Sequence, residues 1–209
     1  MKINAFCTVD PILSKKACDR LIYCGEPCDH DGIVSVPPYS DNIASGEIYL
    51  PDMCFEDDLE DACDYLLNSG ARAIVRAAYE LDETGRIEAR YKLSPIMLLH
   101  KIGVLSACTI VGGVCLDNDD LDLMAQENVP LVITPTASAG YGHGFAPVCA
   151  ALRRGIRVGI GTFDNKYNVK ADLDREIEFL RLVTNAEMSM ENSLSDKELD
   201  AILGFERIN

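Results

Sequence analysis

The segment from Cys24 to His30, with the sequence CGEPCDH, holds the side-chain types that bind metal ions most readily. Thiolate and imidazole groups are typical zinc ligands, but a structural zinc site usually needs two ligand pairs, and only one cysteine pair is local here. Cys7 or Cys18 could complete such a site. We favour the simpler interpretation, in which these cysteines are free thiols in a loop.

Two acidic runs, residues 56–64 and 117–122, resemble calcium loops in composition only. Neither has the spaced oxygen ligands and the central glycine of such a loop. Carboxylates are instead stabilised at the start of a helix by its dipole, so we expect solvent-facing helix starts. A third segment, GYGHG at 140–144, has three glycines but no dinucleotide-binding fingerprint. These glycines would let the loop that carries His143 bend.

Short apolar runs alternate with amphipathic stretches along the chain. This alternation predicts that βα units and a largely parallel sheet position these residues. One expected strand, Ala71–Ala78, is interrupted by Arg76. The expected strands are Lys2–Val9, Gly32–Val36, Gly46–Leu50, Ala71–Ala78, Ala107–Val114, Pro130–Thr134 and Ile156–Gly161. The expected helices are Ser14–Leu21, Glu56–Asn68, Ser94–Ile102, Asp119–Asn128, Ala146–Arg153, Asp172–Val183 and Ser195–Leu203.

Seven strands with helices between them fit either a (β/α) barrel or a doubly wound sheet, and the fold class is α/β. A full barrel typically needs about 250 residues, so this chain is short for eight complete units. We expect one domain over residues 1–209, because we find no repeat, low-complexity tract or linker that would divide it.

The composition narrows the class of protein. Of 209 residues, 48% are hydrophobic, and 19 basic against 34 acidic residues give a net charge of −15. This charge argues against a nucleic-acid partner or an anionic membrane surface. No apolar run approaches the ~18 residues of a membrane span, and we see no signal peptide at the start. Nine cysteines, an odd number without a disulfide-framework spacing, predict free thiols and a cytoplasmic protein.

From residue 70 the sequence resembles a known family. The stretch GARAIVRAAYELDETGRIEARYKLSPIMLLHKIGVL, 70–105, resembles the fifth strand and following helix of the amidohydrolase superfamily, in the branch of cytosine deaminase, adenosine deaminase-like and triazine hydrolase enzymes. TIVGGVCLDNDDLDLMA, 109–125, resembles the sixth strand, and PLVITPTASAGYGHGFAPVCAALRRGIRVGIGTFDN, 130–165, resembles the seventh and eighth. The likeness is best over 70–180, and residues 1–69 match only in outline. The resemblance implies a truncated TIM-like barrel.

Enzymes of this family use a metal-bound hydroxide at the carboxyl ends of their strands. Imidazoles bind the metal ion, and a carboxylate transfers protons. The resemblance puts Arg76 where the fifth-strand histidine stands and Tyr79 where the acid–base glutamate stands, with Glu80 one step away. The sixth-strand histidine corresponds to Gly112, and we find no counterpart of the first-strand His-x-His. A guanidinium would repel a divalent cation, but Arg76 could pair with Glu80 or Asp164 or hold an anionic ligand.

The family's eighth strand ends Gly-Thr-Asp, whereas this chain reads GTFDN at 161–165. Because side chains alternate along a strand, the extra Phe163 would turn Asp164 away from the family position unless a bulge restores it. We take Asp164 and Glu80 as candidate catalytic residues. Four others are candidate pocket residues: Arg76, Tyr79, His143 and Asn165. His100 is expected on a helix surface.

We interpret the chain as an amidohydrolase-like protein that has lost its metal site and acts as a small-molecule-binding, regulatory or subunit protein, with no cofactor. One alternative is a hydrolase acting on C–N bonds, with an unusual metal set on Asp164 and His143 or with a His-x-His supplied by a partner chain. A weaker alternative is a metal-independent enzyme with an acid–base cluster of Arg76, Tyr79, Glu80 and Asp164.

The apparent lack of the first, metal-bearing strand predicts an open sheet edge that something must cover. A homo-oligomer, a partner subunit, or rearrangement of residues 1–45 into the gap would each do so, and Lys2–Val9 could serve the last of these. We favour a homo-oligomer, because closed dimers are the commonest assembly.

Overall fold

The computed structural model describes residues 1–40, 46–53 and 56–205, without the side chains of 56–58. The strands are β1 (Ile3–Cys7), β2 (Arg20–Cys24), β3 (Ile33–Val36), β4 (Ile48–Leu50), β5 (Ala73–Ala77), β6 (Cys108–Gly112), β7 (Leu131–Ile133) and β8 (Val158–Ile160). The helices are α1 (Pro11–Lys15), α2 (Glu56–Ser69), α3 (Leu81–Tyr91), α4 (Pro95–Ile102), α5 (Asn118–Gln126), α6 (Pro135–Tyr141), α7 (Val148–Arg153), α8 (Leu173–Met188) and α9 (Asp196–Leu203), with a 3-10 turn at Leu105–Ala107.

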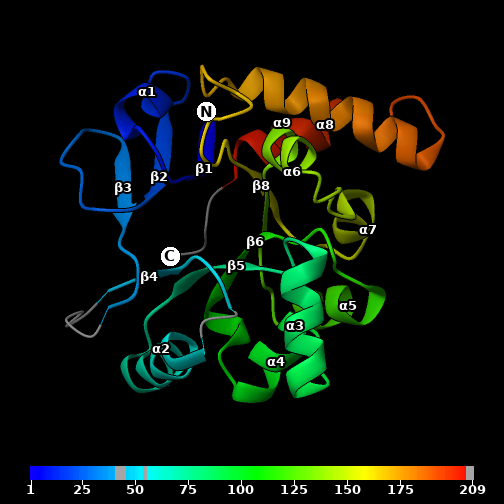
Figure 1. Cartoon of the computed structure of the whole chain (residues 1–209). Coiled ribbons are helices and arrows are strands. Elements are labelled where there is room, and N and C mark those ends of the chain that lie inside the picture. The colour runs from blue at the N-terminus through cyan, green and yellow to red at the C-terminus, as the bar shows by residue number, and fades with distance from the viewer. Residues whose placement is uncertain (41–45, 54–55, 206–209) are drawn as a thin grey trace.

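All strand pairs are parallel, and the strands form two sheets (Figure 1). One sheet has the order β1-β2-β3, and the other has the order β4-β5-β6-β7-β8. Single bridges, Cys7 to Phe163 and Pro38 to Tyr49, link the two sheets at both sides. The eight strands of the described ranges therefore follow one another around a ring whose ladder of backbone hydrogen bonds is interrupted at two places there. This arrangement is the α/β, truncated TIM-like barrel that the resemblance predicts.

The amino-terminal strand fills the place that the sequence analysis left open. The Thr8 amide donates to the Phe163 carbonyl at 3.0 Å, and the Phe163 amide donates to the Phe6 carbonyl at 3.1 Å. β1 thus lies beside the end of β8, which is the rearrangement of residues 1–45 considered above. An open edge is therefore no longer an argument for an oligomer, and the homo-oligomer stays a prediction.

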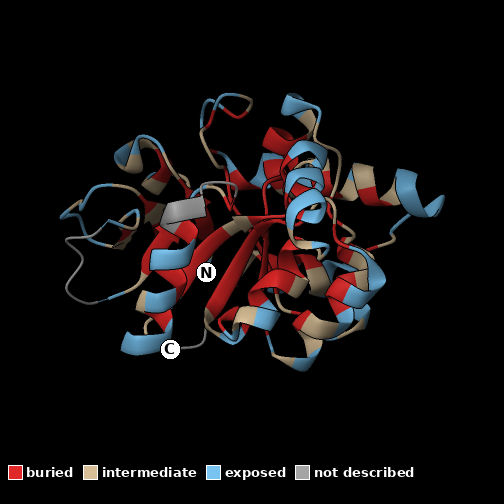
Figure 2. Cartoon of the chain, turned by 60° about the horizontal axis from the view of Figure 1, so that its bottom comes forward, coloured by how far each residue is buried: buried red, intermediate tan, exposed pale blue. Residues whose placement is uncertain are grey.

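Apolar side chains form two separate cores, one inside the ring of strands and one between the strands and the helices. The inner core takes one or more residues from seven strands and is completed by Phe205, which follows α9. The outer core is larger and includes buried apolar residues of every helix from α2 to α9 except α6. Figure 2 shows the buried residues in the strands and on the helix faces turned toward them. No helix in the described ranges is long and apolar enough to cross a membrane.

The structure corrects three of the expected elements. Residues 20–24 form β2, not the end of a helix over Ser14–Leu21, because the apolar LIYC run pairs with both β1 and β3. Helices α3 and α6 lie in stretches where no helix was expected. The polar α3 buries only Glu83, Thr84 and Ile87. By contrast, the expected caps at Ser94 and Ser195 are present, since each hydroxyl accepts an amide hydrogen of the first turn.

Candidate functional site

The carboxyl ends of β5, β7 and β8 bring a group of aromatic and charged side chains to one opening of the ring, which we call the mouth. In this architecture the loops after the strands form the catalytic face. A cavity of about 10 Å³ lies there, enough for roughly one water molecule. Its lining includes Phe6, Arg76, Tyr79, Tyr141, His143 and Phe163.

Arg76, on β5, projects into the mouth between two aromatic rings. Its guanidinium carbon lies 3.7 Å from the centre of the Tyr79 ring and 4.7 Å from that of Phe163. Such cation–π contacts stabilise a partly dehydrated guanidinium, each by about 0.5–2 kcal/mol. Among the described ion pairs, Arg76 has no carboxylate partner, so the expected pairing with Glu80 or Asp164 is not formed. Arg76 also lines the cavity at the mouth.

Glu80 and His143 form the titratable pair of the mouth. Glu80 is the N-cap residue of α3, and His143 lies in the loop after α6, where its Nε2 is 3.1 Å from Glu80 Oε2. Burial lowers the pKa of His143, the Glu80 carboxylate opposes that shift, and Arg76 adds to it. The imidazole is therefore neutral near pH 7, in contact with a carboxylate. The same ring stacks on Tyr141, with centroids 5.6 Å apart and planes 20° apart.

Phe163, and not Asp164, takes the inward position at the end of β8. Phe163 has a left-handed backbone (φ +56°), and its ring stacks on Phe6 at 5.7 Å. Asp164 consequently lies at the rim, where it accepts hydrogen bonds from the Tyr141 hydroxyl and, at 3.0 Å, from the Lys166 amide. The bond to Asp164 is the main reason that the pKa of Tyr141 rises to about 12. Asp164 thus reaches the mouth through Tyr141.

The backbone at the ends of β5 and β6 explains why Tyr79 and Glu80 both reach the mouth. Ala78 adopts a left-handed conformation (φ +50°), which changes the alternation of the side chains that follow. Gly112 has φ +102°, and a Cβ placed on it would lie 2.5 Å from the Tyr79 Cβ. The position matched to the family's sixth-strand histidine is thus occupied by Tyr79, and no larger side chain fits there without a backbone shift.

One sequence-based assignment does not hold in the structure. Asn165, expected in the pocket, is buried, and its side-chain amide donates to Ser14 Oγ at 2.9 Å, on the side of α1. In the Cys24–His30 segment, neither Cys24 nor Cys28 forms a disulfide, and the described residues contain no group of three or more potential metal ligands. Cys24 is the buried last residue of β2 and not part of a loop, whereas Cys28 lies in the segment between β2 and β3.

Two residues of the mouth were not singled out from the sequence, namely Tyr141 and Phe163 as ring partners. Tyr141 lies two residues before His143 in the GYGHG stretch, and Phe163 is the extra residue in GTFDN. An aromatic residue within two positions of a candidate histidine or carboxylate was the signal that could have identified each of them, because such rings can stack on or cover the candidate side chain.

No protein-family model matches the sequence. Relatives named 5-methylthioadenosine/S-adenosylhomocysteine deaminase do match part of it. The protein from Caldicellulosiruptor saccharolyticus is 29% identical over 119 residues, 56% of this chain and 28% of the relative. The one from Halothermothrix orenii is 33% identical over 96 residues, 46% of this chain and 22% of the relative. The chain thus matches about a quarter of the length of these relatives.

Solved structures show the same fold at lower sequence identity. An adenosine deaminase from Xanthomonas campestris with bound zinc has a TM-score of 0.66 and 18% identity, covering 85% of this chain and 40% of that one. Guanine deaminase from C. acetobutylicum has a TM-score of 0.66 and 14% identity, covering 96% and 56%. An atrazine chlorohydrolase from Arthrobacter aurescens complexed with zinc has a TM-score of 0.63 and 19% identity, covering 86% and 40%. Together with the relatives, they confirm the resemblance to the amidohydrolase superfamily.

These neighbours overturn the expectation that no cofactor is involved, because two of the three structures contain zinc. The described residues of this chain do not themselves fit a zinc ion, however. His143 and Glu80 are paired with each other, a guanidinium fills the mouth, and the Gly112 position leaves no room for an imidazole. Two ligands fall short of the three protein ligands of a catalytic zinc site. A zinc ion at this mouth would need further ligands.

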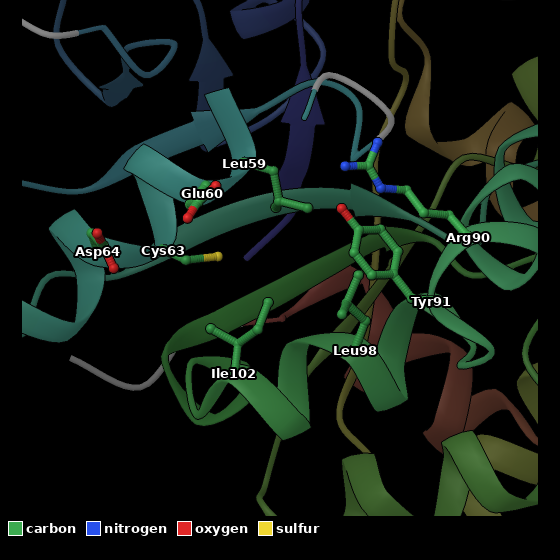
Figure 3. A pocket seen from close by; sticks show the side chains of 8 residues that line it. All are labelled: Leu59, Glu60, Cys63, Asp64, Arg90, Tyr91, Leu98 and Ile102. Atoms are coloured by element: carbon green, nitrogen blue, oxygen red, sulfur yellow. The ribbon is translucent and has the colours of Figure 1, made fainter. Parts of the chain in front are cut away.

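A second cavity, larger than the one at the mouth, lies in the layer of helices (Figure 3). It has a volume of about 470 Å³ between α2, α3 and α4. Apolar side chains line one part, and Glu60, Asp64 and Arg90 line the rest, with the Cys63 thiol pointing into the space. Charges of both signs surround it, so its lining does not select one class of ligand. The cavity is separate from the strand ends, and we assign no catalytic role to it.

Proposed function

We propose that the chain is a deaminase-type hydrolase that acts on a C–N bond of a heteroaromatic small molecule at the mouth of the ring. The observation that carries this proposal is the contact between His143 and Glu80 at the carboxyl ends of the strands. The deaminase names of the relatives support it. They also favour the hydrolase alternative over the interpretation of a protein without hydrolase activity.

The paired side chains have the properties that proton transfer requires. A neutral imidazole can take a proton from an attacking water, and a carboxylate in contact with it stabilises the imidazolium that forms. In hydrolytic deamination the water oxygen bonds to the carbon and the C–N bond breaks. The imidazolium gives the proton it took from water to the departing amino group, which leaves as ammonia, and the second water proton stays on the product. Because burial and Arg76 lower the pKa of His143, its base form predominates near neutral pH.

The aromatic walls fit a flat, nitrogen-containing ring. Tyr79, Tyr141 and Phe163 surround the same space, and offset or edge-on ring contacts are worth about 0.5–1.5 kcal/mol each beyond burial. The Arg76 guanidinium supplies donors for a ring nitrogen or an exocyclic oxygen. A cavity of about 10 Å³ is too small for such a ring, so Arg76 must leave its place between Tyr79 and Phe163 when substrate enters.

Release of ammonia tests the proposal. The chain should release ammonia from at least one of adenosine, methylthioadenosine, S-adenosylhomocysteine and guanine, assayed with and without added zinc. His143→Ala and Glu80→Gln should each lower kcat/KM by about a hundredfold or more, as loss of a general base does. His100→Ala is the matched control, since His100 pairs with Glu127 on the helix surface and should leave kcat/KM unchanged. Binding of these compounds without ammonia release under either condition would contradict the proposal and favour a binding protein.

A cytoplasmic location is part of the same proposal. Eight cysteines in the described ranges form no disulfide, which suits a reducing compartment. Fractionation of the source cells, followed by detection of the chain in the cytosolic or the extracellular fraction, tests this assignment.

A further inference from the structure

A second opening of the ring lies at the amino-terminal ends of the strands, opposite the mouth, and it holds a cavity of about 170 Å³. We call this cavity the floor site. It is lined by Arg72, Ser106, Ala107, Cys108, Thr109, Glu127, Asn128, Pro130 and Arg157. At about 30 Å³ for each water molecule, this is room for roughly five waters, or for one small polyatomic anion.

The two arginines reach the floor site from β5 and β8 by the regular alternation of strand side chains. Arg72 stands two residues before Ile74, which belongs to the inner core, so both side chains face the inside of the ring. Arg157 stands two residues before Gly159, whose missing Cβ leaves room for the Phe205 ring inside. The Arg157 guanidinium lies 6.0 Å from the centre of that ring.

The electrostatics of the floor site favour an anion. Burial lowers the pKa of Arg157, and the positive charge of Arg72 lowers it further, which places the two guanidinium groups within electrostatic range of each other. In a chain with a net charge of −15, two arginines gathered in one cavity are a marked local excess of positive charge. Glu127 also lines the cavity, but its Oε1 is bonded to His100 Nδ1. The Ser106 and Thr109 hydroxyls add neutral donors to the lining.

We propose that the floor site binds a phosphate-type dianion between Arg72 and Arg157. Two guanidinium forks match the geometry of phosphate oxygens, which accept paired hydrogen bonds from arginine. The volume suits a free phosphate or the phosphate group of a small monoester, and it excludes a nucleotide. Because the site lies across the ring from the mouth, such a ligand would act apart from the substrate, joining the starts of β5 and β8.

Calorimetric titration of the whole chain with inorganic phosphate tests this inference. Phosphate should bind at one site per chain, and the affinity should fall as sodium chloride is added, because the contacts are ionic. Arg72→Ala and Arg157→Gln should each weaken binding roughly tenfold or more, the loss expected for one charged hydrogen-bonded contact. Arg86→Ala is the matched control, since Arg86 pairs with Asp82 on the exposed face of α3 and should bind phosphate like the parent chain.

Arg72 is exposed, so its replacement leaves the core intact and guards against a variant that merely fails to fold. Parallel titrations with methyl phosphate distinguish the sources of the ligand. Tighter binding of the monoester would indicate a phosphorylated small molecule, and tighter binding of inorganic phosphate would indicate the free ion. Absence of binding heat in both titrations, or equal affinities for the parent chain and Arg72→Ala, would overturn the proposal.

Discussion

Replacement of Gly112 by alanine is the sharpest test of how β5 and β6 shape the mouth. Two effects add in this variant. A non-glycine residue in left-handed backbone costs about 1–2 kcal/mol, and Gly112 has φ +102°. The new Cβ would also stand 2.5 Å from the Tyr79 Cβ and 3.1 Å from its Cα, well inside the usual carbon–carbon contact distance of about 3.5–4.0 Å. Overpacking of this kind costs about 1–3 kcal/mol.

Gly142→Ala separates the two effects. Gly142 also has a positive φ, +78°, but no atom lies within 4 Å of the Cβ that alanine would add. Both variants reduce the entropy of the unfolded chain alike, so that contribution cancels between them. The difference in free energy of unfolding between Gly112→Ala and Gly142→Ala therefore measures the clash with Tyr79, about 1–3 kcal/mol.

Urea denaturation followed by circular dichroism gives this difference. With a urea dependence of about 1–3 kcal/mol per M, the midpoint of Gly112→Ala should lie roughly 1 M below that of Gly142→Ala. Gly112→Ala should also shift the Tyr79 ring away from Arg76, with loss of any activity at the mouth. Equal midpoints for the two variants would refute the close approach of Tyr79 to Gly112 and the account of the mouth built on it.

Three other outcomes are expected. Burial is the main reason that the pKa of His143 is lowered, so the folded chain disfavours protonation of this imidazole. Its contribution to stability is therefore present above the unfolded pKa of about 6.5 and is lost as pH falls. Between about pH 7.5 and 5.5, the urea midpoint should drop more for the parent chain than for His143→Gln. Burial and, to a smaller extent, the charge of Asp52 raise the pKa of Glu83 to about 8. The stabilisation from its protonated form is therefore present at low pH and is lost as pH rises through about 8. Between low pH and about pH 9, Glu83→Gln should lose less stability than the parent chain, and an equal loss would contradict the assignment. Light scattering at micromolar concentration should give a mass of at least two chains if the predicted homo-oligomer forms, and a particle of 22.9 kDa would exclude it.

The sequence was most informative where burial and helix caps leave strong local signals. Apolar runs predicted seven of the eight strands, and the Ser94-Pro95 start of α4 was predicted because capping is a local interaction. The expected helix Ser14–Leu21 included the first two residues of β2, and the rest of β2 was assigned to no element. The flanking strands β1 and β3, which local sequence does not show, decide the conformation of this segment. Helix α3 was not predicted because its polar sequence lacks a clear apolar period. Tertiary contacts bury its small apolar face, and local sequence does not show such contacts.

The sequence predicted several of the residues that lie at the mouth, but not the contacts between them. Arg76, Tyr79, Glu80 and His143 were all named from the sequence, and the structure brings them together. The left-handed backbone at Ala78 and Phe163 decides which side chains face inward, and no propensity predicts positive φ at alanine or phenylalanine. Asn165 was misplaced for the same reason, because its own left-handed backbone (φ +59°) accompanies a side chain directed toward Ser14.

The two isolated bridges that join the sheets divide the molecule into parts of unequal cooperativity. Each sheet is continuous within itself, but Cys7–Phe163 and Pro38–Tyr49 are the only bridges between the sheets in the described chain. The inner core includes side chains of both sheets, but units joined by so few backbone hydrogen bonds can open one at a time, with free energies below that of global unfolding. Amide hydrogens of β1 to β3 should then exchange with solvent as one group, ahead of those of β5 to β7. The amino-terminal sheet would behave as a separate foldon, able to leave and rejoin a barrel wall that otherwise persists.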